Sequence, residues 1–174
     1  RLFDVRILPS YIKRLIDYFE LFWDSSIWNI LVENTNAYAQ YKEARNKDNK
    51  LEKKSRWWKA ITLYEMRIFI ALLIYIGIAG TSHIESYWKD SNAIHKPMAF
   101  MTYFRFQQIK RYFHISSPTS RLPLSQWYSK LEPLASSLRT RFQAYVVLSQ
   151  NVSFDEMMIP FSGRSKHTLK MNNK

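Results

Sequence analysis

Apolar residues recur at helical spacing through the first part of the chain. In residues 10–22, and again in residues 26–41, one side of the segment is largely apolar. Ser10 suits the N-cap of the first segment and Asp24 or Ser25 that of the second, because their side-chain oxygens can accept hydrogen bonds from the free amides of a first helical turn. We therefore predict two amphipathic helices, with apolar faces that include Leu15, Phe19, Phe22, Ile27, Ile30 and Leu31.

The most apolar stretch covers residues 68–79, where nearly every side chain is hydrophobic. Thr62 and Glu65 form a capping-box pattern ahead of it, and Gly80 suits the end of a helix. A helix that is apolar on all sides is either buried or in a membrane. A bilayer needs about 20 apolar residues, and this run is shorter and follows Arg67. We predict the central, buried helix of a helical bundle and no membrane association.

Two further helices are predicted in the second half of the chain. Within residues 102–115 three side chains share a face and are expected in the core: Phe106, Ile109 and Phe113. Arg105, Lys110 and Arg111 are then left for a surface, which is either a solvated basic face or a DNA contact. Apolar residues at helical spacing also predict a long helix over residues 127–145, and Pro133 marks a kink or a restart within it.

Near the end of the chain, alternation replaces helical spacing. Val152 and Phe154 alternate with polar residues and an apolar run follows, which predicts a strand that carries Asp155. Gly163 suits the following turn, because glycine adopts positive φ without steric cost, and residues 166–171 would be the returning strand. A carboxylate on a buried strand needs a cation or hydrogen bonds. Asp155 is therefore either a ligand or a hydrogen-bonded residue at a strand end.

Composition limits the function classes. The 174 residues carry a formal net charge of +12, which favours polyanionic partners. Hydrophobic residues make up 47% of the sequence, enough for one ordinary domain with a sizeable core. Cysteine is absent, which excludes disulfides and thiolate zinc sites, and the histidines lack ligand spacing. Residues 42–59 are the most charged segment and are predicted to be a basic linker, either a solvated spacer or a phosphate contact.

Three groups of residues give the chain a resemblance to a known family, the piggyBac-like transposases. Together they span most of the sequence. They are Asp155-Glu156 followed by Phe161-x-Gly163-Arg164 and Asn173-Lys174, the string from Glu33 to Ala39, and the helix that contains Phe104, Arg105, Phe106, Ile109, Phe113 and His114.

The resemblance implies a mainly α protein. Residues 1–148 would form a helical bundle that corresponds to a dimerisation and DNA-binding domain and contains the basic linker. Residues 149–174 would be the first β-hairpin of a truncated RNase H-like α/β domain. A larger protein is expected around this segment.

The resemblance also implies a chemistry. In that family the position of Asp155 holds the first of three catalytic aspartates, which bind Mg²⁺ for DNA cleavage and strand transfer. Two metals activate the attacking oxygen and stabilise the leaving one. No Asp or Glu follows Glu156, and Glu156 itself points to the other strand face. This chain alone is therefore expected to be inactive.

The implied partners are double-stranded DNA, both transposon ends and target, and a second copy of the chain, with a location in the nucleus. Arg164, Lys166, Lys170 and Lys174 are predicted to follow a phosphate backbone, in addition to the basic residues of the 102–115 helix. The alternative hypothesis is a domesticated, non-catalytic DNA-binding or protein-interaction module of the same ancestry. A third treats the chain as a basic helical protein that binds RNA or acidic partners.

Overall fold

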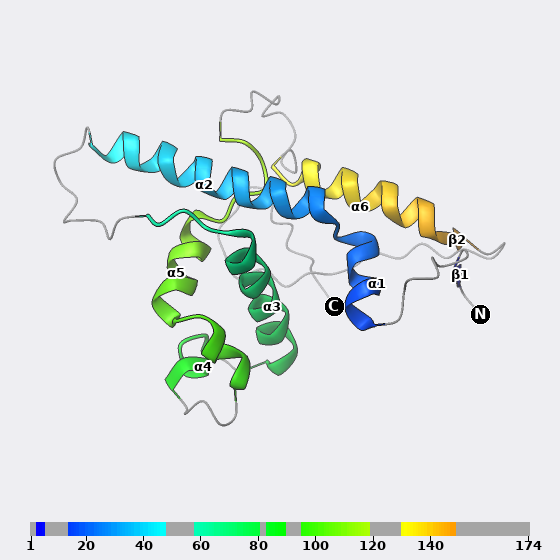
Figure 1. Ribbon diagram of the computed structural model, residues 1–174, viewed down its shortest axis with the longest axis horizontal. Coiled ribbons are helices and arrows are strands. Elements are labelled where there is room, and N and C mark those ends of the chain that lie inside the picture. Colours follow the sequence, from blue (N-terminus) through cyan, green and yellow to red (C-terminus); the bar gives the residue numbers. More distant parts are fainter. Residues whose placement is uncertain are drawn as a thin grey trace, which may run out of the picture.

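Helices form most of the part of the chain that the structure describes. The computed structural model describes residues 3–5, 14–47, 58–80, 83–89, 95–118 and 130–148. The elements occur in the order β1 (Phe3–Val5), α1 (Leu15–Phe22), α2 (Ser25–Lys47), α3 (Leu63–Ala79), α4 (Ser86–Lys89), the 3₁₀ helix η1 (Lys96–Phe100), α5 (Tyr103–Tyr112), α6 (Glu132–Tyr145) and β2 (Val146–Leu148) (Figure 1). The prediction of a mainly α fold is confirmed.

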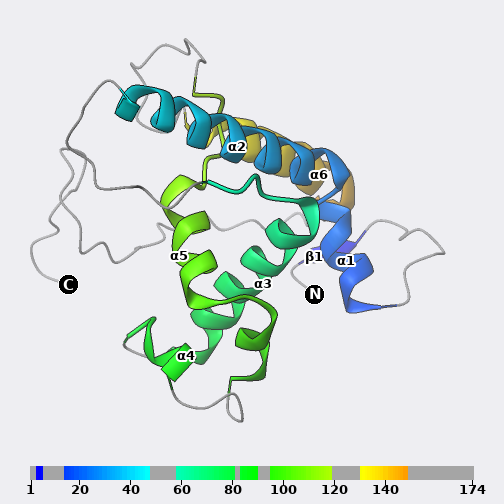
Figure 2. The same cartoon turned by 60° about the vertical axis from the view of Figure 1, so that its left-hand side comes forward.

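The long helix α2 lies across the other helices. Asp24 begins it, because its Oδ1 accepts hydrogen bonds from the backbone N–H groups of Ser26 and Ile27, each at 3.1 Å. Helices α3 and α5 both pack against α2 and extend away from it on the same side (Figures 1 and 2). Helix α6 packs on α1, where Phe22 meets the ring of Phe142 at a centroid distance of 4.9 Å, and Leu134 and Leu138 of α6 also lie against the core.

The hydrophobic core lies where α2, α3, α5 and the short helices meet. Its most deeply buried large side chains are Ile27, Leu31, Met66, Phe69, Leu72, Tyr87, Met98, Phe106 and Ile109. Burial of one such side chain stabilises the fold by about 1.5–3 kcal/mol. Two of the three residues predicted to share the core face of the 102–115 helix, Phe106 and Ile109, are fully buried, and Phe113 packs against them from a half-buried position.

Helix α3 begins and ends as its sequence predicts. The Thr62 hydroxyl accepts a hydrogen bond from the N–H of Glu65 at 3.2 Å, and the Glu65 carboxylate accepts one from the N–H of Thr62 at 3.1 Å. Gly80 ends the helix in the left-handed conformation with a φ of 64°, which a glycine adopts without strain.

The prediction that α3 is buried on all sides is wrong. Leu73 is 37% exposed, Ile74 48% and Ile78 82%. Helix α3 packs mainly on α2 and η1, and in the described part of the chain these three side chains are left partly exposed. None of the described helices is long and apolar enough to cross a membrane.

Several predicted boundaries also change. Helix α1 starts at Leu15, and Ser10 lies outside the described residues. Helix α2 continues to Lys47, so the first third of the predicted 42–59 linker is helical, while residues 48–57 lie outside the described part. Pro133 stands in the first turn of α6 and therefore marks its start, the second of the two predicted options.

A two-stranded sheet joins distant parts of the chain. Strand β1 pairs antiparallel with β2, with Phe3 opposite Leu148 and Val5 opposite Val146. The sequence pattern did not predict either strand, because three residues are too few to show alternation. The predicted hairpin in residues 149–174 lies outside the described residues, so the RNase H-like part of the fold stays a prediction.

Candidate nucleic-acid interface

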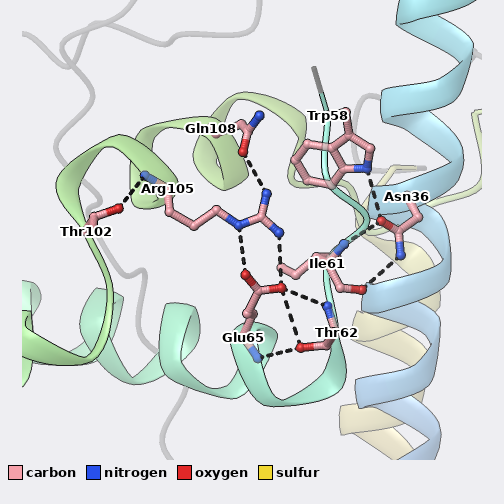
Figure 3. Close-up of polar contacts among 8 residues, drawn as sticks. All are labelled: Asn36, Trp58, Ile61, Thr62, Glu65, Thr102, Arg105 and Gln108. Atoms are coloured by element: carbon pink, nitrogen blue, oxygen red, sulfur yellow. Dashed lines mark hydrogen bonds and ion pairs between the residues drawn. The ribbon is translucent and has the colours of Figure 1, made fainter. Parts of the chain in front are cut away.

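The middle of α2 holds the segment that leads into α3. The Asn36 side-chain oxygen accepts hydrogen bonds from the indole N–H of Trp58 at 3.1 Å and the backbone N–H of Ile61 at 2.8 Å. Its amide group donates to the carbonyl of Ile61 at 3.1 Å. Figure 3 shows this amide between the indole and the backbone that enters α3. One side chain thus fixes the path of residues 58–61, and Glu43 adds a fourth bond by accepting from the N–H of Trp58 at 3.0 Å.

The same part of α2 also holds the segment that leaves α5. Asn34 donates to the carbonyl of Ile115 at 2.6 Å, and the hydroxyl of Thr35 accepts from the backbone N–H of His114 at 3.3 Å. The ring of Tyr38 stacks on the imidazole of His114 with centroids 4.0 Å apart and an angle of 1° between the rings. The string from residue 33 to 39 therefore carries polar groups that bind two segments distant in sequence.

An ion pair connects α3 to α5. The Arg105 guanidinium donates through Nε and Nη2 to the two carboxylate oxygens of Glu65, at 2.9 and 3.0 Å, and through Nη1 to Gln108 at 2.6 Å (Figure 3). It also lies 5.1 Å from the ring centroid of Trp58. Because its side chain is only 13% exposed, the prediction that Arg105 is left for the surface is wrong.

Electrostatics at Glu65 agree with this geometry. Burial by itself would raise the pKa of the Glu65 carboxyl, but the hydrogen bond from Arg105, the backbone N–H of Thr62 and the charges of Arg105 and Lys59 together lower the pKa below its ordinary value. The carboxylate thus remains charged at neutral pH and keeps Arg105 engaged. Arg105 can then position α5 against α3, whereas Lys110 and Arg111 at the end of α5 are exposed, as predicted.

Six described cations lie on α2, on the two segments that it anchors, or close to His114. We call Lys42, Arg45, Lys59, Lys110, Arg111 and Lys130 the basic cluster; Lys42 is half-buried and the other five are exposed. Within the described part of the chain, none of the six lies in an ion pair with a carboxylate. Elsewhere most cations are paired, as the bridges Arg14–Asp17, Arg67–Glu20, Lys89–Glu85, Arg139–Glu132 and Arg141–Asp24 show.

Ring contacts show how the cluster is held together. The Lys42 ammonium lies 5.5 Å from the ring centroid of Tyr38, which stacks on His114. Both Lys130 and Lys42 are close enough to lower the pKa of His114.

The other side of the cluster is organised around Tyr112. The Arg111 guanidinium lies 5.9 Å from its ring centroid, and the ring packs edge-on against Trp58 at 5.0 Å. Lys59 directly follows Trp58. Cations from α2, from the turn before α3, from the end of α5 and from the start of α6 thus lie near one another, although they are far apart in sequence.

The other five predicted site residues all lie outside the described residues. These are Asp155, Arg164, Lys166, Lys170 and Lys174. Among the residues that are described, no three histidine, aspartate or glutamate side chains are placed to hold a metal ion. The Mg²⁺ site therefore rests on the family resemblance alone, and no described side chain receives a catalytic role. Sequence reasoning noted the charge of residues 42–59 but missed Lys130, which has no pattern of its own.

An apolar groove runs along the exposed face of α3. It has a volume of about 520 Å³ and lies between α1, α3 and η1, with a lining that includes Ile16, Phe19, Ile68, Ile74 and Phe100. A second hollow of about 370 Å³ continues it toward the end of α3 and shares Ile68, Ile74 and Phe100. The groove is distinct from the basic cluster and contains one ion pair, Arg67–Glu20, at 3.4 Å.

A cluster of basic side chains is one of the features expected of a nucleic-acid-binding protein. The family model described as Transposase IS4 matches residues 16–174, so the chain belongs to this transposase family. Among its relatives, the sequence is 26% identical to the human PiggyBac transposable element-derived protein 3 over 147 residues, which are 83% of this chain and 22% of that protein. It is 27% identical to the human PiggyBac transposable element-derived protein 5 over 146 residues, which are 83% of this chain and 26% of that protein.

These relatives confirm the resemblance to piggyBac-like transposases. The chain spans about a quarter of the length of the curated relatives it matches. No solved structure matches it.

Proposed function

We propose that this chain is the helical DNA-binding part of a piggyBac-like transposase and that the basic cluster contacts the phosphate backbone of duplex DNA. The observation that carries the proposal is a group of six cations that lie on α2, on the segments that α2 holds in place or, for Lys130, close to His114. Within the described part of the chain these cations have no carboxylate partner. Family membership supports DNA as the substrate class. Phosphate contacts position a protein on DNA without reading its sequence.

The anchoring by α2 makes these cations suitable for phosphate binding. Lys59 directly follows Trp58 and Lys110 lies two residues before Tyr112, and these two rings pack against each other. Lys42 lies on α2 itself. Their backbones are therefore fixed relative to one another before DNA arrives. Since lysine and arginine displace condensed counterions from DNA, the binding constant should fall steeply with salt concentration, with a slope of about −0.9 per phosphate contacted.

A charge-neutralised variant tests this proposal. The substitutions Lys42→Gln, Lys110→Gln and Lys130→Gln should reduce the magnitude of the salt slope by up to about 2.7, since each removes one phosphate contact. A matched control removes the same number of charges elsewhere through Lys89→Gln, Lys96→Gln and Arg139→Gln. Fluorescence anisotropy of a labelled duplex over a series of salt concentrations measures both. Equal slopes for the two variants would refute the basic cluster as the DNA-binding surface.

For the longer protein we propose metal-dependent DNA cleavage and strand transfer, with Asp155 as one of its three catalytic aspartates. The support is the family match, which continues through residue 174 and so includes this position. The variant Asp155→Asn keeps the shape of the side chain but removes the charge. In a full-length protein it should abolish Mg²⁺-dependent nicking and leave DNA binding unchanged. The 174-residue chain by itself should show no nicking, and nuclease activity of this chain would contradict its proposed incompleteness.

The second candidate function is a domesticated module that binds DNA or protein without cleavage. The apolar groove on α3 favours it, because an exposed apolar surface of this kind often marks a protein contact. In either case we propose a nuclear location and an assembly that includes a homodimer. The coding sequence beyond Lys174 discriminates the two functions, since only an active transposase needs both further aspartates. The oligomeric state follows from the mass in light scattering, where a monomer at all concentrations would contradict the homodimer.

A further inference from the structure

His114 lies within the basic cluster, on the segment that leaves α5. Its backbone N–H donates to the hydroxyl of Thr35 at 3.3 Å, and its ring stacks flat on Tyr38 at 4.0 Å. The imidazole is half-buried. The backbone and the ring are thus both in contact with α2.

Among the described residues, the charged groups that act on this ring are the cations Lys130 and Lys42. Lys42 and Tyr38 face it from α2, Lys130 approaches from the start of α6, and Arg111 lies three residues before it on α5. Glu43, the acid next to Lys42, is engaged with the backbone of Trp58 at 3.0 Å. Burial is the largest cause that lowers the pKa of His114, and the charge of Lys130 is the next. A hydrogen bond to the backbone of Phe113 raises this pKa in part, and the charge of Lys42 lowers it further. The free protein therefore keeps His114 neutral at neutral pH.

We propose that duplex DNA binds the basic cluster together with a proton, which the His114 imidazole takes up. This inference rests on the proposed function, because it needs phosphates at the cluster. A phosphate that pairs with Lys42 or Lys130 cancels the positive charge that opposes protonation of the ring. The imidazolium then adds one more cation for the DNA, and the face of Tyr38 stabilises it through a cation–π contact.

The direction of the effect follows from linkage. If the pKa of His114 is higher in the complex than in the free protein, binding takes up a proton and the affinity rises as pH falls between the two values. One proton at one site limits the change to about tenfold in affinity per pH unit. Neutral imidazole at alkaline pH makes no such contribution, so the affinity should level off there.

The test compares three proteins over about pH 5 to 8 at constant ionic strength. Wild type should bind a labelled duplex about tenfold more tightly at the acid end than at the alkaline end. His114→Gln cannot titrate but still offers a hydrogen-bond donor, and its affinity should be nearly constant with pH. His83→Gln is the control, since His83 is an exposed histidine outside the cluster, and it should behave as wild type does.

A second measurement covers the case in which His114→Gln does not fold. The imidazole of His114 in wild type can be titrated by NMR with and without the duplex, and its pKa should rise in the complex. An unchanged pKa, or a pH dependence that persists in His114→Gln, overturns the inference. Strong DNA binding that does not vary with pH overturns it and leaves the proposed function standing. An absence of DNA binding at every pH overturns both.

Discussion

The ion pair between Arg105 and Glu65 gives the sharpest prediction about the described fold. The substitution Arg105→Met keeps an unbranched apolar stem but removes the guanidinium, which lies over the ring of Trp58. Glu65 then loses two hydrogen bonds, at 2.9 and 3.0 Å, and the positive charge of its partner. Its capping bond to the N–H of Thr62 at 3.1 Å remains, so α3 should still begin at the same residue.

The degree of burial sets the size of the effect. Loss of one partner from a fully buried pair costs about 3–5 kcal/mol, whereas an exposed pair contributes about 0–1 kcal/mol. The Arg105 and Glu65 side chains are 13% and 22% exposed, which places this pair between the two cases. We expect Arg105→Met to lower the free energy of unfolding by about 2–3 kcal/mol. With a urea dependence of about 2 kcal/mol per molar, the unfolding midpoint should fall by about 1–1.5 M.

Urea denaturation followed by tryptophan fluorescence measures this cost, and the double-mutant cycle with Glu65→Gln isolates the pair. The pKa of Glu65 is lowered in the folded protein. The stabilisation by the ion pair is therefore complete above pH 4.5, the ordinary pKa of glutamate, and is lost as pH falls through the lower pKa of the folded state. The cost of Arg105→Met should therefore shrink in acid. A coupling energy below about 0.5 kcal/mol, or a cost that does not change in acid, would refute the reasoning. The salt slope of DNA binding should stay at the wild-type value, since Arg105 is not in the basic cluster.

Three other predictions concern stability. Asn36→Ala removes three hydrogen bonds, two of them to the backbone of Ile61, and should cost about 2–3 kcal/mol in urea denaturation; an unchanged midpoint would mean that residues 58–61 do not depend on this anchor. Leu72 is 1% exposed, so Leu72→Asp puts a charge in the core and should abolish folding. Leu73 is 37% exposed, and Leu73→Asp should cost about 1 kcal/mol or less. Circular dichroism distinguishes the two outcomes. The pKa of His114 is lowered in the folded state, so its contribution to stability is present above pH 6.5, the ordinary pKa of histidine, and is lost as pH falls. In thermal melts, His114→Gln should therefore lose less stability in acid than wild type does. Identical losses would contradict the lowered pKa.

The sequence predicted those features that depend on neighbouring residues. Asp24 caps α2, and Thr62 caps α3 together with Glu65, because each cap is a contact within one turn of helix. Gly80 ends α3 for the same local reason. The helical period also placed Phe106 in the core.

Features that depend on distant partners were out of reach. Arg105 was predicted for the surface because its partner Glu65 lies 40 residues earlier, and no periodicity links the two. The apolar pattern of α3 predicted burial on every side, but a pattern reports only which residues are hydrophobic and not what covers them. The anchoring role of Asn36 was missed because an amide side chain on a helix is most often exposed to solvent. The catalytic assignment of Asp155 stays a prediction.

The pairing of β1 with β2 has a consequence for how this unit can be rearranged. Phe3 and Leu148 are opposite one another in the ladder, and such partners have Cα atoms about 5 Å apart. A short linker could therefore join the two strands directly, and new termini could be opened between Lys47 and Trp58. The cut lies outside helices α2 and α3 themselves, and circular permutation succeeds where few native contacts are cut. The permuted chain should keep the helical packing and the basic cluster, and it would place both new ends beside the cluster, where a donor and an acceptor dye could report the approach of DNA.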